Sequence, residues 1–511
     1  MHRRSCLRRS TLPAVLWAAG VLLVVWGCRD RPPADEGAHA EERLVGAARH
    51  LQQALVVEGL PLETWPIEER MRQFSVPGVS AAVLDGGRLV AARAWGVKAA
   101  GDRDSVTTET MFQAGSLSKP VTALLALSLV EGGRLSLDRP INDVLRSWTV
   151  PENELTRRTP VTLRHVLSHQ AGFTRFGYLI ARSEGTVSGM ADLLRGDTHD
   201  WPAVTVEEEP GTTHAYSNTG FCVLQMALED VSGLTLHELA VQQLFGPLDM
   251  RHSRFDEPLE ATTLEAAAAG HTRQRREDGS RGDPVMVDGR AQMAPAAAGG
   301  LWSTPSDLGR LIEDVLRARR DEGPRVLTAE IAEAYLTPQV PGEGLGIHLD
   351  GAGAALRARH TGGMDGFVAH LVFYPASGQG AVVMSNSDGG SLLNGELIAA
   401  IAAEFQWPGY PVRRRLGTAS PEQLDPLVGV YESDAHPGTT FAVRLDGDVA
   451  TGQVNQYPRF ELTPTDVPDH FVLPSRSLEV VFERDDAGHV DAVTLGTAGE
   501  AGSRYSRRPD P

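Results

Sequence analysis

The sequence predicts an α+β protein in which helices and a helical subdomain flank an antiparallel sheet, followed by a small all-β, barrel-like domain. The segments Val79 to Leu84 and Leu89 to Trp95 flank the turn Asp85-Gly86-Gly87 and predict a hairpin. The apolar helix predicted at Leu117 to Glu131 follows this hairpin. No strand–Gly-x-Ser-x-Gly–helix elbow occurs in the chain, which argues against an α/β-hydrolase. From Leu427 onward only short β segments and turns occur, without a helical period.

The main domain is predicted to span residues 46–406, with a linker at 407–425 and the β domain at 426–508. Apolar residues at helical spacing from Leu44 to Leu55 predict a helix at its start. The main domain's later elements are expected to be strands at Gly344 to Asp350, Phe367 to Phe373 and Gly380 to Met384, and a helix at Leu392 to Phe405. The β domain's strands are expected at Thr440 to Leu445, Leu478 to Glu483 and Val490 to Leu495.

Residues 1–28 predict an export signal, because four arginines precede the apolar run Leu12 to Trp26. This run is shorter than a membrane span of about 20 residues. It ends Val25-Trp26-Gly27-Cys28, which resembles a bacterial lipobox with Cys28 as the acylated residue. An uncleaved N-terminal anchor and ordinary secretion are the alternatives, and all three place the protein outside the cytoplasm. Residues 29–45, which contain Pro32-Pro33, predict a flexible tether from the membrane.

The formal net charge of −18 excludes most nucleic-acid binding, because such a surface repels phosphate backbones. The chain has three cysteines, so lipidation of Cys28 leaves no disulfide framework. Cys222 lies in an apolar helical run and is expected to be a buried small hydrophobe.

Ser116 and Lys119 form the first candidate catalytic pair. The chain has two lysines against 46 arginines (48 minus 2), and one of the two lies three residues after this serine. A desolvated lysine can lose its proton, whereas arginine cannot. Residues i and i+3 share one face of a helix, so we expect Ser116 to be a nucleophile and Lys119 its proton acceptor. A chance serine before a lysine is the alternative.

Two histidines, His165 and His169, lie one helical turn apart, a spacing that can bind a metal ion. No third ligand follows at the spacing of known zinc motifs, so a structural role is favoured and no metal or cofactor is predicted.

Two further motifs follow in chain order. Tyr216 and Asn218 precede a helix predicted at Thr219 to Val231, and by themselves they also fit a half-buried aromatic residue and a helix cap. His360 opens the stretch His360 to Gly366, whose glycines permit close backbone approach by a ligand. By itself His360 equally fits a solvent-facing turn residue.

Together, Ser116-Leu117-Ser118-Lys119, Tyr216-Ser217-Asn218 and His360-Thr361-Gly362 resemble the ordered motifs of the serine β-lactamase-related, penicillin-binding hydrolases. That group contains class C β-lactamases, D-Ala-D-Ala peptidases and esterases. The resemblance covers roughly residues 60–406 and implies a β-lactamase/transpeptidase-like fold. The last domain resembles the lipocalin-like domains that often follow such hydrolases.

The resemblance implies a role for each matching residue. Ser116 would be acylated, Lys119 would accept its proton, and Tyr216 would exchange protons with Lys119 and the leaving group. Asn218 would position the substrate amide and Lys119, and the backbone N–H groups of Ser116 and Gly363 would form the oxyanion hole. This matches the general requirement that a hydroxyl nucleophile has an adjacent base and its oxyanion has two donors.

His360 departs from class C β-lactamases, which carry lysine before Thr-Gly. With Thr361 it would contact the substrate, but a mostly neutral histidine holds a carboxylate less firmly. We therefore expect an exported enzyme, anchored to the membrane by a lipid or its N-terminus, that cleaves a small-molecule or peptide ester or amide. A D-amino-acid peptide is one such substrate. A D-Ala-D-Ala carboxypeptidase or weak β-lactamase, and a non-catalytic envelope binding module, are the alternatives.

Overall fold

The computed structural model describes residues 34–175, 179–180, 189–197, 202–255, 261–275, 281–287, 292–293, 296–323, 326–434, 436–499 and 502–508. The predicted export signal and the lipidation of Cys28 lie outside these residues. No helix among those described is long and apolar enough to cross a membrane.

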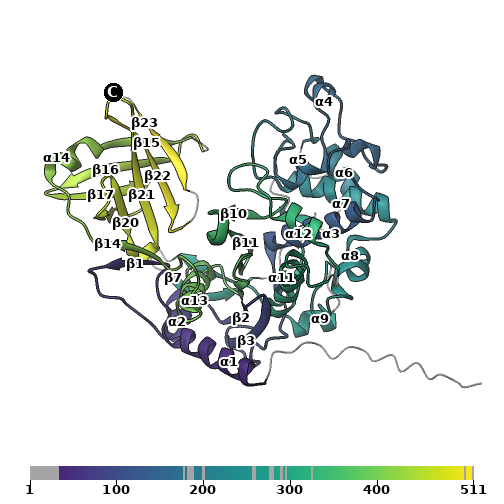
Figure 1. The fold of residues 1–511 in the computed structure, drawn as a ribbon, viewed down its shortest axis with the longest axis horizontal. Coiled ribbons are helices and arrows are strands. Elements are labelled where there is room, and N and C mark those ends of the chain that lie inside the picture. The colour runs from purple at the N-terminus through teal and green to yellow at the C-terminus, as the bar shows by residue number, and fades with distance from the viewer. Residues whose placement is uncertain are drawn as a thin grey trace, which may run out of the picture.

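Six antiparallel strands form the central sheet in the order β10-β11-β12-β13-β2-β3 (Figure 1). Their bounds are β2 Gly78–Asp85, β3 Arg88–Gly96, β10 His348–Asp350, β11 Arg357–Met364, β12 Phe367–Tyr374 and β13 Gln379–Ser385. The predicted hairpin is confirmed, with Asp85 paired to Arg88 across the glycine turn. The strand predicted from Gly344 contains only its last three residues, because Gly346 takes a positive φ of 78° that breaks the extended backbone.

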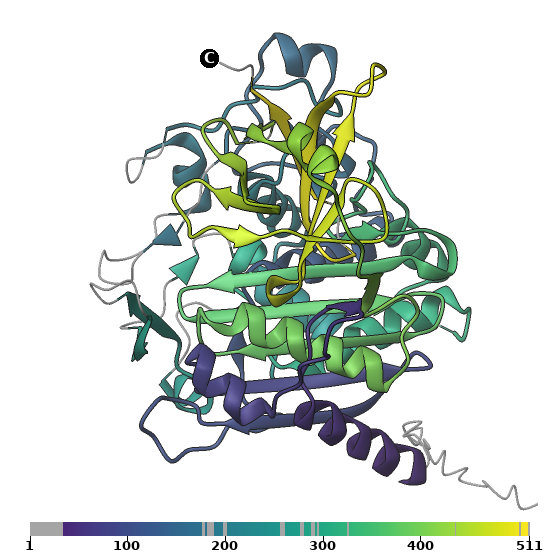
Figure 2. The ribbon, with the colours of Figure 1, turned by 90° about the vertical axis from the view of Figure 1, so that its left-hand side faces the viewer.

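Three helices cover one face of this sheet: α1 Ala34–Arg49, α2 Ile67–Phe74 and α13 Gly390–Glu404. In Figure 2 the strands of the sheet run horizontally. The purple N-terminal helix lies below them, and the yellow C-terminal strands lie above them. Most of the predicted tether at residues 29–45 instead belongs to α1. Ala40, Leu44 and Ala47 recur at helical spacing and are buried against the sheet layer, so the segment packs.

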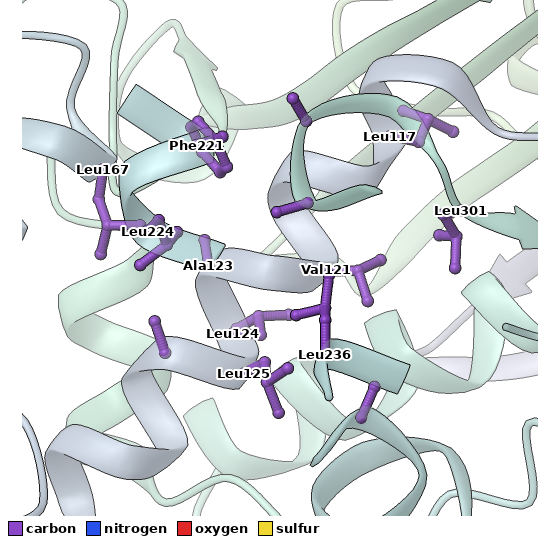
Figure 3. Close-up of a cluster of buried hydrophobic side chains, with 14 of the residues drawn as sticks. Leu117, Val121, Ala123, Leu124, Leu125, Leu167, Phe221, Leu224, Leu236 and Leu301 are labelled. Atoms are coloured by element: carbon purple, nitrogen blue, oxygen red, sulfur yellow. The ribbon is translucent and has the colours of Figure 1, made fainter. Parts of the chain in front are cut away.

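The opposite face carries α11 Pro305–Arg319 and the helical subdomain, built around α3 Ser118–Glu131 and α7 Asn218–Ser232. Side chains from α3 and α7 interleave around Leu124, Phe221 and Leu224 (Figure 3). Cys222 on α7 is fully buried, as predicted. Helix α3 is buried almost all round, and its polar residues Ser118 and Lys119 at the N-terminal end are buried with it.

The shorter helices are α4 Glu154–Arg158, α5 Leu163–Leu167, α6 Met190–Arg195, α8 Leu236–Ala240, α9 Ala261–Ala266, α10 Ala296–Gly299 and α12 Ala329–Tyr335. Four two-stranded sheets pair β1 Leu55–Glu58 with β14 Val412–Arg415, β4 Phe112–Gln113 with β9 Trp302–Ser303, β5 Leu179–Ile180 with β8 Gln292–Met293, and β6 His271–Arg275 with β7 Arg281–Met286.

The C-terminal domain is a nine-stranded antiparallel sheet in the order β18-β17-β16-β15-β23-β22-β21-β20-β19. Its strands are β15 Gly429–Ser433, β16 Thr440–Asp446, β17 Val449–Val454, β18 Phe460–Glu461, β19 Thr463–Pro464, β20 His470–Leu473, β21 Leu478–Arg484, β22 Val490–Thr497 and β23 Ser503–Arg507. The two outermost strands, β18 and β19, are separated by one residue, so the sheet curls into a nearly closed barrel around Tyr431 and Phe441.

The region predicted as a linker at 407–425 contains regular structure. It includes β14 and α14 Pro421–Leu424. Leu55, expected in a helix, begins β1 and pairs in parallel with Val412. Both side chains are buried in a small cluster with Val472 of the C-terminal domain, so these strands fasten that domain to the main one.

Candidate active site

The turn that carries Ser116, the candidate nucleophile, lies between the helical subdomain and the sheet; we call it the nucleophile turn. Gly115 to Leu117 form a 3₁₀ turn, η1, that leads directly into α3. Gly115 has a φ of 53°, and a Cβ there would lie 2.8 Å from the backbone nitrogen of Gly363. Only glycine allows this approach, so the turn holds Ser116 against strand β11.

Lys119 reaches back along α3 to Ser116. Its Nζ lies 3.2 Å from Ser116 Oγ and donates a second hydrogen bond, at 2.8 Å, to the backbone carbonyl of Ala298. The residue is fully buried, and this burial lowers the pKa of Lys119 to about 7. A substantial fraction of the amine is therefore neutral near pH 7 and able to accept a proton from the serine.

Tyr216 covers the same pair from the other side. The Lys119 Nζ lies 4.7 Å from the centre of the Tyr216 ring. Although 39% of the residue's surface is exposed, its hydroxyl is hydrogen-bonded with Ser116. Burial raises the pKa of Tyr216 to about 12, against the opposing effect of that hydrogen bond. The tyrosine thus carries its proton at neutral pH. Asn218 follows as the first residue of α7, which Ser217 caps.

Strand β11 forms the opposite wall. Its neighbour β10 pairs only with Arg357 to Arg359, so the described strands leave the outer edge from His360 to Met364 without a ladder partner. Thr361 and Gly363 are exposed along this stretch. A Cβ on Gly362 would lie 1.9 Å from the carbonyl oxygen of Ala114, so this glycine is what lets the strand approach the nucleophile turn.

His360 lies within β11 rather than in a solvent-facing turn. It is 2% exposed, and its Nδ1 lies 2.7 Å from the carbonyl oxygen of Thr361. Burial, together with the neighbouring charges of His348 and Lys119, lowers the pKa of His360 well below its ordinary value. The ring is therefore neutral at pH 7, and no cation occupies the position at which class C β-lactamases carry lysine.

Residues 67–404 match the family model described as beta-lactamase. The chain belongs to this family. It is 28% identical to penicillin-binding protein 4 of Amycolatopsis lactamdurans over 71% of this chain and 94% of that protein. It is 23% identical to the D-alanyl-D-alanine-carboxypeptidase/endopeptidase AmpH of Escherichia coli K12, over 60% of this chain and 78% of AmpH.

A D-aminopeptidase from Cereibacter sphaeroides is 23% identical over 85% of this chain and 80% of its own length. Among solved structures, the octameric penicillin-binding protein homologue from Pyrococcus abyssi matches with a TM-score of 0.54 and 22% identity, covering 86% of this chain and 98% of its own. SurE matches with a TM-score of 0.56 and 24% identity, covering 86% of this chain and 97% of its own. These structures share the fold, and the family membership makes this chain a serine hydrolase of the β-lactamase family.

The structure of this β-lactamase-family enzyme also brings together polar residues that sequence reasoning missed. Glu343, His348 and His214 converge beside Tyr216 and His360. We call these three the His–Glu cluster. His214 could have been noticed, because it lies two residues before Tyr216 in an extended segment and so projects the same way. Glu343 comes from the loop before β10, His348 is the first residue of β10, and neither carries a sequence signal for a site.

The two histidines that lie one turn apart, His165 and His169, make structural hydrogen bonds. His165 Nδ1 accepts a hydrogen bond from the backbone N–H of Thr162 at the start of α5, and His169 Nδ1 accepts one from Ser217. The ring of His169 packs 4.5 Å from that of Tyr216. In the part of the chain that is described, no group of three or more His, Cys, Asp or Glu side chains could hold a metal ion.

Proposed function

We propose that the protein is an exported serine hydrolase that cleaves an ester or amide through a covalent acyl-Ser116 intermediate. The observation that carries this proposal is the fully buried Lys119, whose amine touches Ser116 Oγ and whose pKa is lowered to about 7. A neutral amine in contact with a serine hydroxyl is the arrangement that activates a nucleophile.

The acylation step uses the groups around the nucleophile turn. Ser116 Oγ attacks the substrate carbonyl carbon while its proton passes to Lys119 Nζ. The carbonyl oxygen becomes an oxyanion that accepts hydrogen bonds from the backbone N–H groups of Ser116 and Gly363. The tetrahedral intermediate then collapses, the bond to the leaving group breaks, and the proton travels from Lys119 through Tyr216 to that group. Asn218 and Thr361 hold the substrate in place.

The substrate class we favour is a small ester or a peptide that contains D-amino acids. Named relatives include a D-aminopeptidase, which matches 85% of this chain, and a D-alanyl-D-alanine carboxypeptidase. A cavity of about 480 Å³ lies along β11, where Thr361 and Gly363 line it together with Arg476 and Ser477 of the C-terminal domain. The neutral ring of His360 argues against efficient β-lactam hydrolysis, because it supplies no fixed positive charge for a substrate carboxylate.

Three probes test the proposal on the mature protein beside Ser116→Ala: a short-chain nitrophenyl ester, a chromogenic cephalosporin and a fluorescent penicillin. We expect ester turnover that the substitution abolishes, with little cephalosporin turnover. Stable penicillin labelling with cleavage of a D-Ala-D-Ala peptide would instead favour a carboxypeptidase. Equal, negligible reaction of wild type and variant with every probe would leave the binding module as the surviving alternative.

The predicted anchor has its own test. If Cys28 is lipidated, Cys28→Ser releases the protein from the membrane fraction into the soluble fraction. Retention of the variant in membranes would contradict lipidation and favour an uncleaved N-terminal segment.

A further inference from the structure

A second acid–base pair lies within the His–Glu cluster. The carboxylate of Glu343, whose side chain is 1% exposed, lies with Oε2 2.6 Å from Nδ1 of His348. A carboxylate only accepts hydrogen bonds, so Nδ1 carries the proton and Nε2 keeps the lone pair of the ring. The side chain of His348 is 25% exposed, which leaves it accessible to water. A histidine held in this tautomer by a buried carboxylate is equipped to accept a proton.

The ring of Tyr216 connects the pair of Glu343 and His348 to Ser116. The ring of His348 stacks on that of His360 at 4.9 Å and 13°, and its centre is 6.4 Å from that of Tyr216. The Tyr216 hydroxyl in turn is hydrogen-bonded with Ser116. His214 turns its Nε2 toward the same Glu343 oxygen at 3.7 Å, so the carboxylate faces two histidines at the rim of the site.

The other groups around Ser116 are poorly placed to take a proton from water. Lys119 is fully buried and occupied by Ser116 and Ala298. The pKa of Tyr216 is raised to about 12, so its hydroxyl keeps its proton at neutral pH. It can therefore donate a proton there but cannot accept one from water. His360 and His169 each use Nδ1 in a backbone contact and have Nε2 buried. Of the two histidines that face Glu343, His348 makes the hydrogen bond, at 2.6 Å against 3.7 Å for His214, and so has both an accessible ring nitrogen and an orienting carboxylate.

We propose that His348, oriented by Glu343, is the general base that activates the water which hydrolyses acyl-Ser116. The inference rests on the acyl-enzyme of the proposed function. Water gives one proton to Nε2 of His348, and its oxygen bonds to the acyl carbon. The bond from that carbon to Ser116 Oγ then breaks, Oγ takes the proton of the Tyr216 hydroxyl, and His348 returns its proton to Tyr216 through solvent. The acid product leaves and the free enzyme is restored.

Rapid-mixing kinetics of His348→Gln with a nitrophenyl ester test the step. Glutamine keeps the polarity of the site but cannot act as a base near neutral pH. We expect a burst of about one nitrophenolate per Ser116 at the wild-type acylation rate, followed by a steady rate reduced on the order of 10²–10⁴-fold. Intact mass measured during the slow phase should show the acyl adduct on the protein.

Two further variants distinguish the loss of a catalytic base from a loss of folding. Glu343→Gln, which alters the positioning residue, should give the same burst with a smaller loss of the steady rate. His348→Gly should show a slow phase that added imidazole accelerates, because the free base can enter the emptied place. The matched control is His489→Gln, which removes the histidine of an exposed Asp485 pair in the C-terminal domain and should leave both phases unchanged.

The outcomes are distinct. If acylation and deacylation slow together, or if the steady rate of His348→Gln equals that of wild type, the role of His348 as base is wrong while acyl-Ser116 stands. If imidazole fails to rescue His348→Gly although the burst is intact, the base role is equally overturned. If wild type releases no nitrophenolate and forms no adduct, the proposed function itself fails.

Discussion

Two histidine–carboxylate pairs, one in the main domain and one in the C-terminal domain, differ in burial, with different consequences. At the active site Glu343 holds His348 at 2.6 Å and is 1% exposed. In the C-terminal domain Asp485 lies 3.4 Å from His489, and the two side chains are 40% and 81% exposed. Water solvates and screens the second pair, so it contributes little. The first pair cannot be screened in this way, and the charge of Glu343 helps to raise the pKa of Tyr216.

Burial therefore separates the charged groups that water screens from those that it does not. The C-terminal barrel carries exposed ion pairs such as that of Arg504 with Asp434, whose side chains are 43% and 42% exposed. The main domain buries Lys119, which has no carboxylate partner among the described residues, and it buries the pair of Arg70 and Glu396 between α2 and α13.

The largest effect is expected at Lys119. Lys119→Arg keeps the positive charge but cannot supply a neutral amine, so turnover of a nitrophenyl ester should fall on the order of 10²–10⁴-fold. Lys98→Arg, at the only other lysine, is the control and should retain wild-type turnover, because the Lys98 amine donates to the backbone carbonyl of Glu265 rather than to Ser116. Activity retained in Lys119→Arg would contradict the role of Lys119 as proton acceptor.

The buried ion pair of Arg70 and Glu396 should matter more for stability than the exposed pair of Arg504 and Asp434 on the barrel. Two hydrogen bonds join the two side chains, which are 7% and 5% exposed. Glu396→Gln leaves Arg70 buried without its counter-charge and should lower the free energy of unfolding by about 3–5 kcal/mol. Asp434→Asn should cost only about 0.2–1 kcal/mol. Urea unfolding followed by far-UV circular dichroism compares them, and equal losses would contradict the distinction.

Gly362 and Gly363 give a matched pair on one strand. A Cβ at position 362 would meet the Ala114 carbonyl oxygen at 1.9 Å, whereas one at 363 meets nothing within 4 Å. Gly362→Ala should push β11 from the nucleophile turn and reduce kcat/KM about 10²-fold. Gly363→Ala keeps its backbone N–H and should stay near the wild-type value. Steady-state ester kinetics test this, and similar losses in both variants would refute it.

The acylation rate should depend on pH through Lys119. The amine must be neutral to accept the serine proton, and its pKa is lowered to about 7. The rate should therefore be maximal above this pH and fall about tenfold for each unit below it. Tyr216, with a pKa raised to about 12, stays protonated over the same range. A burst rate that is flat from pH 5 to 8 would show that Lys119 is not the titrating base.

Local patterns in the sequence predicted the fold well. The hairpin of β2 and β3 follows from alternation around a glycine turn, and α3 from a long apolar run with a glycine stop. The segment 34–45 shows the limit of such patterns. Its polar composition predicts a tether, but Ala40, Leu44 and Ala47 gain enough from burial against the sheet layer to order a helix.

The sequence by itself determined which residue types could do chemistry and in which order they occur. Ser116, Lys119, Tyr216 and His360 were identified from motifs, because helical spacing and chain order are local properties. The tertiary structure decided their protonation states. The pKa of Lys119 near 7 and the neutral ring of His360 depend on burial by elements distant in the chain. It alone also placed Glu343 against His348, since loop contacts have no period that a sequence can display.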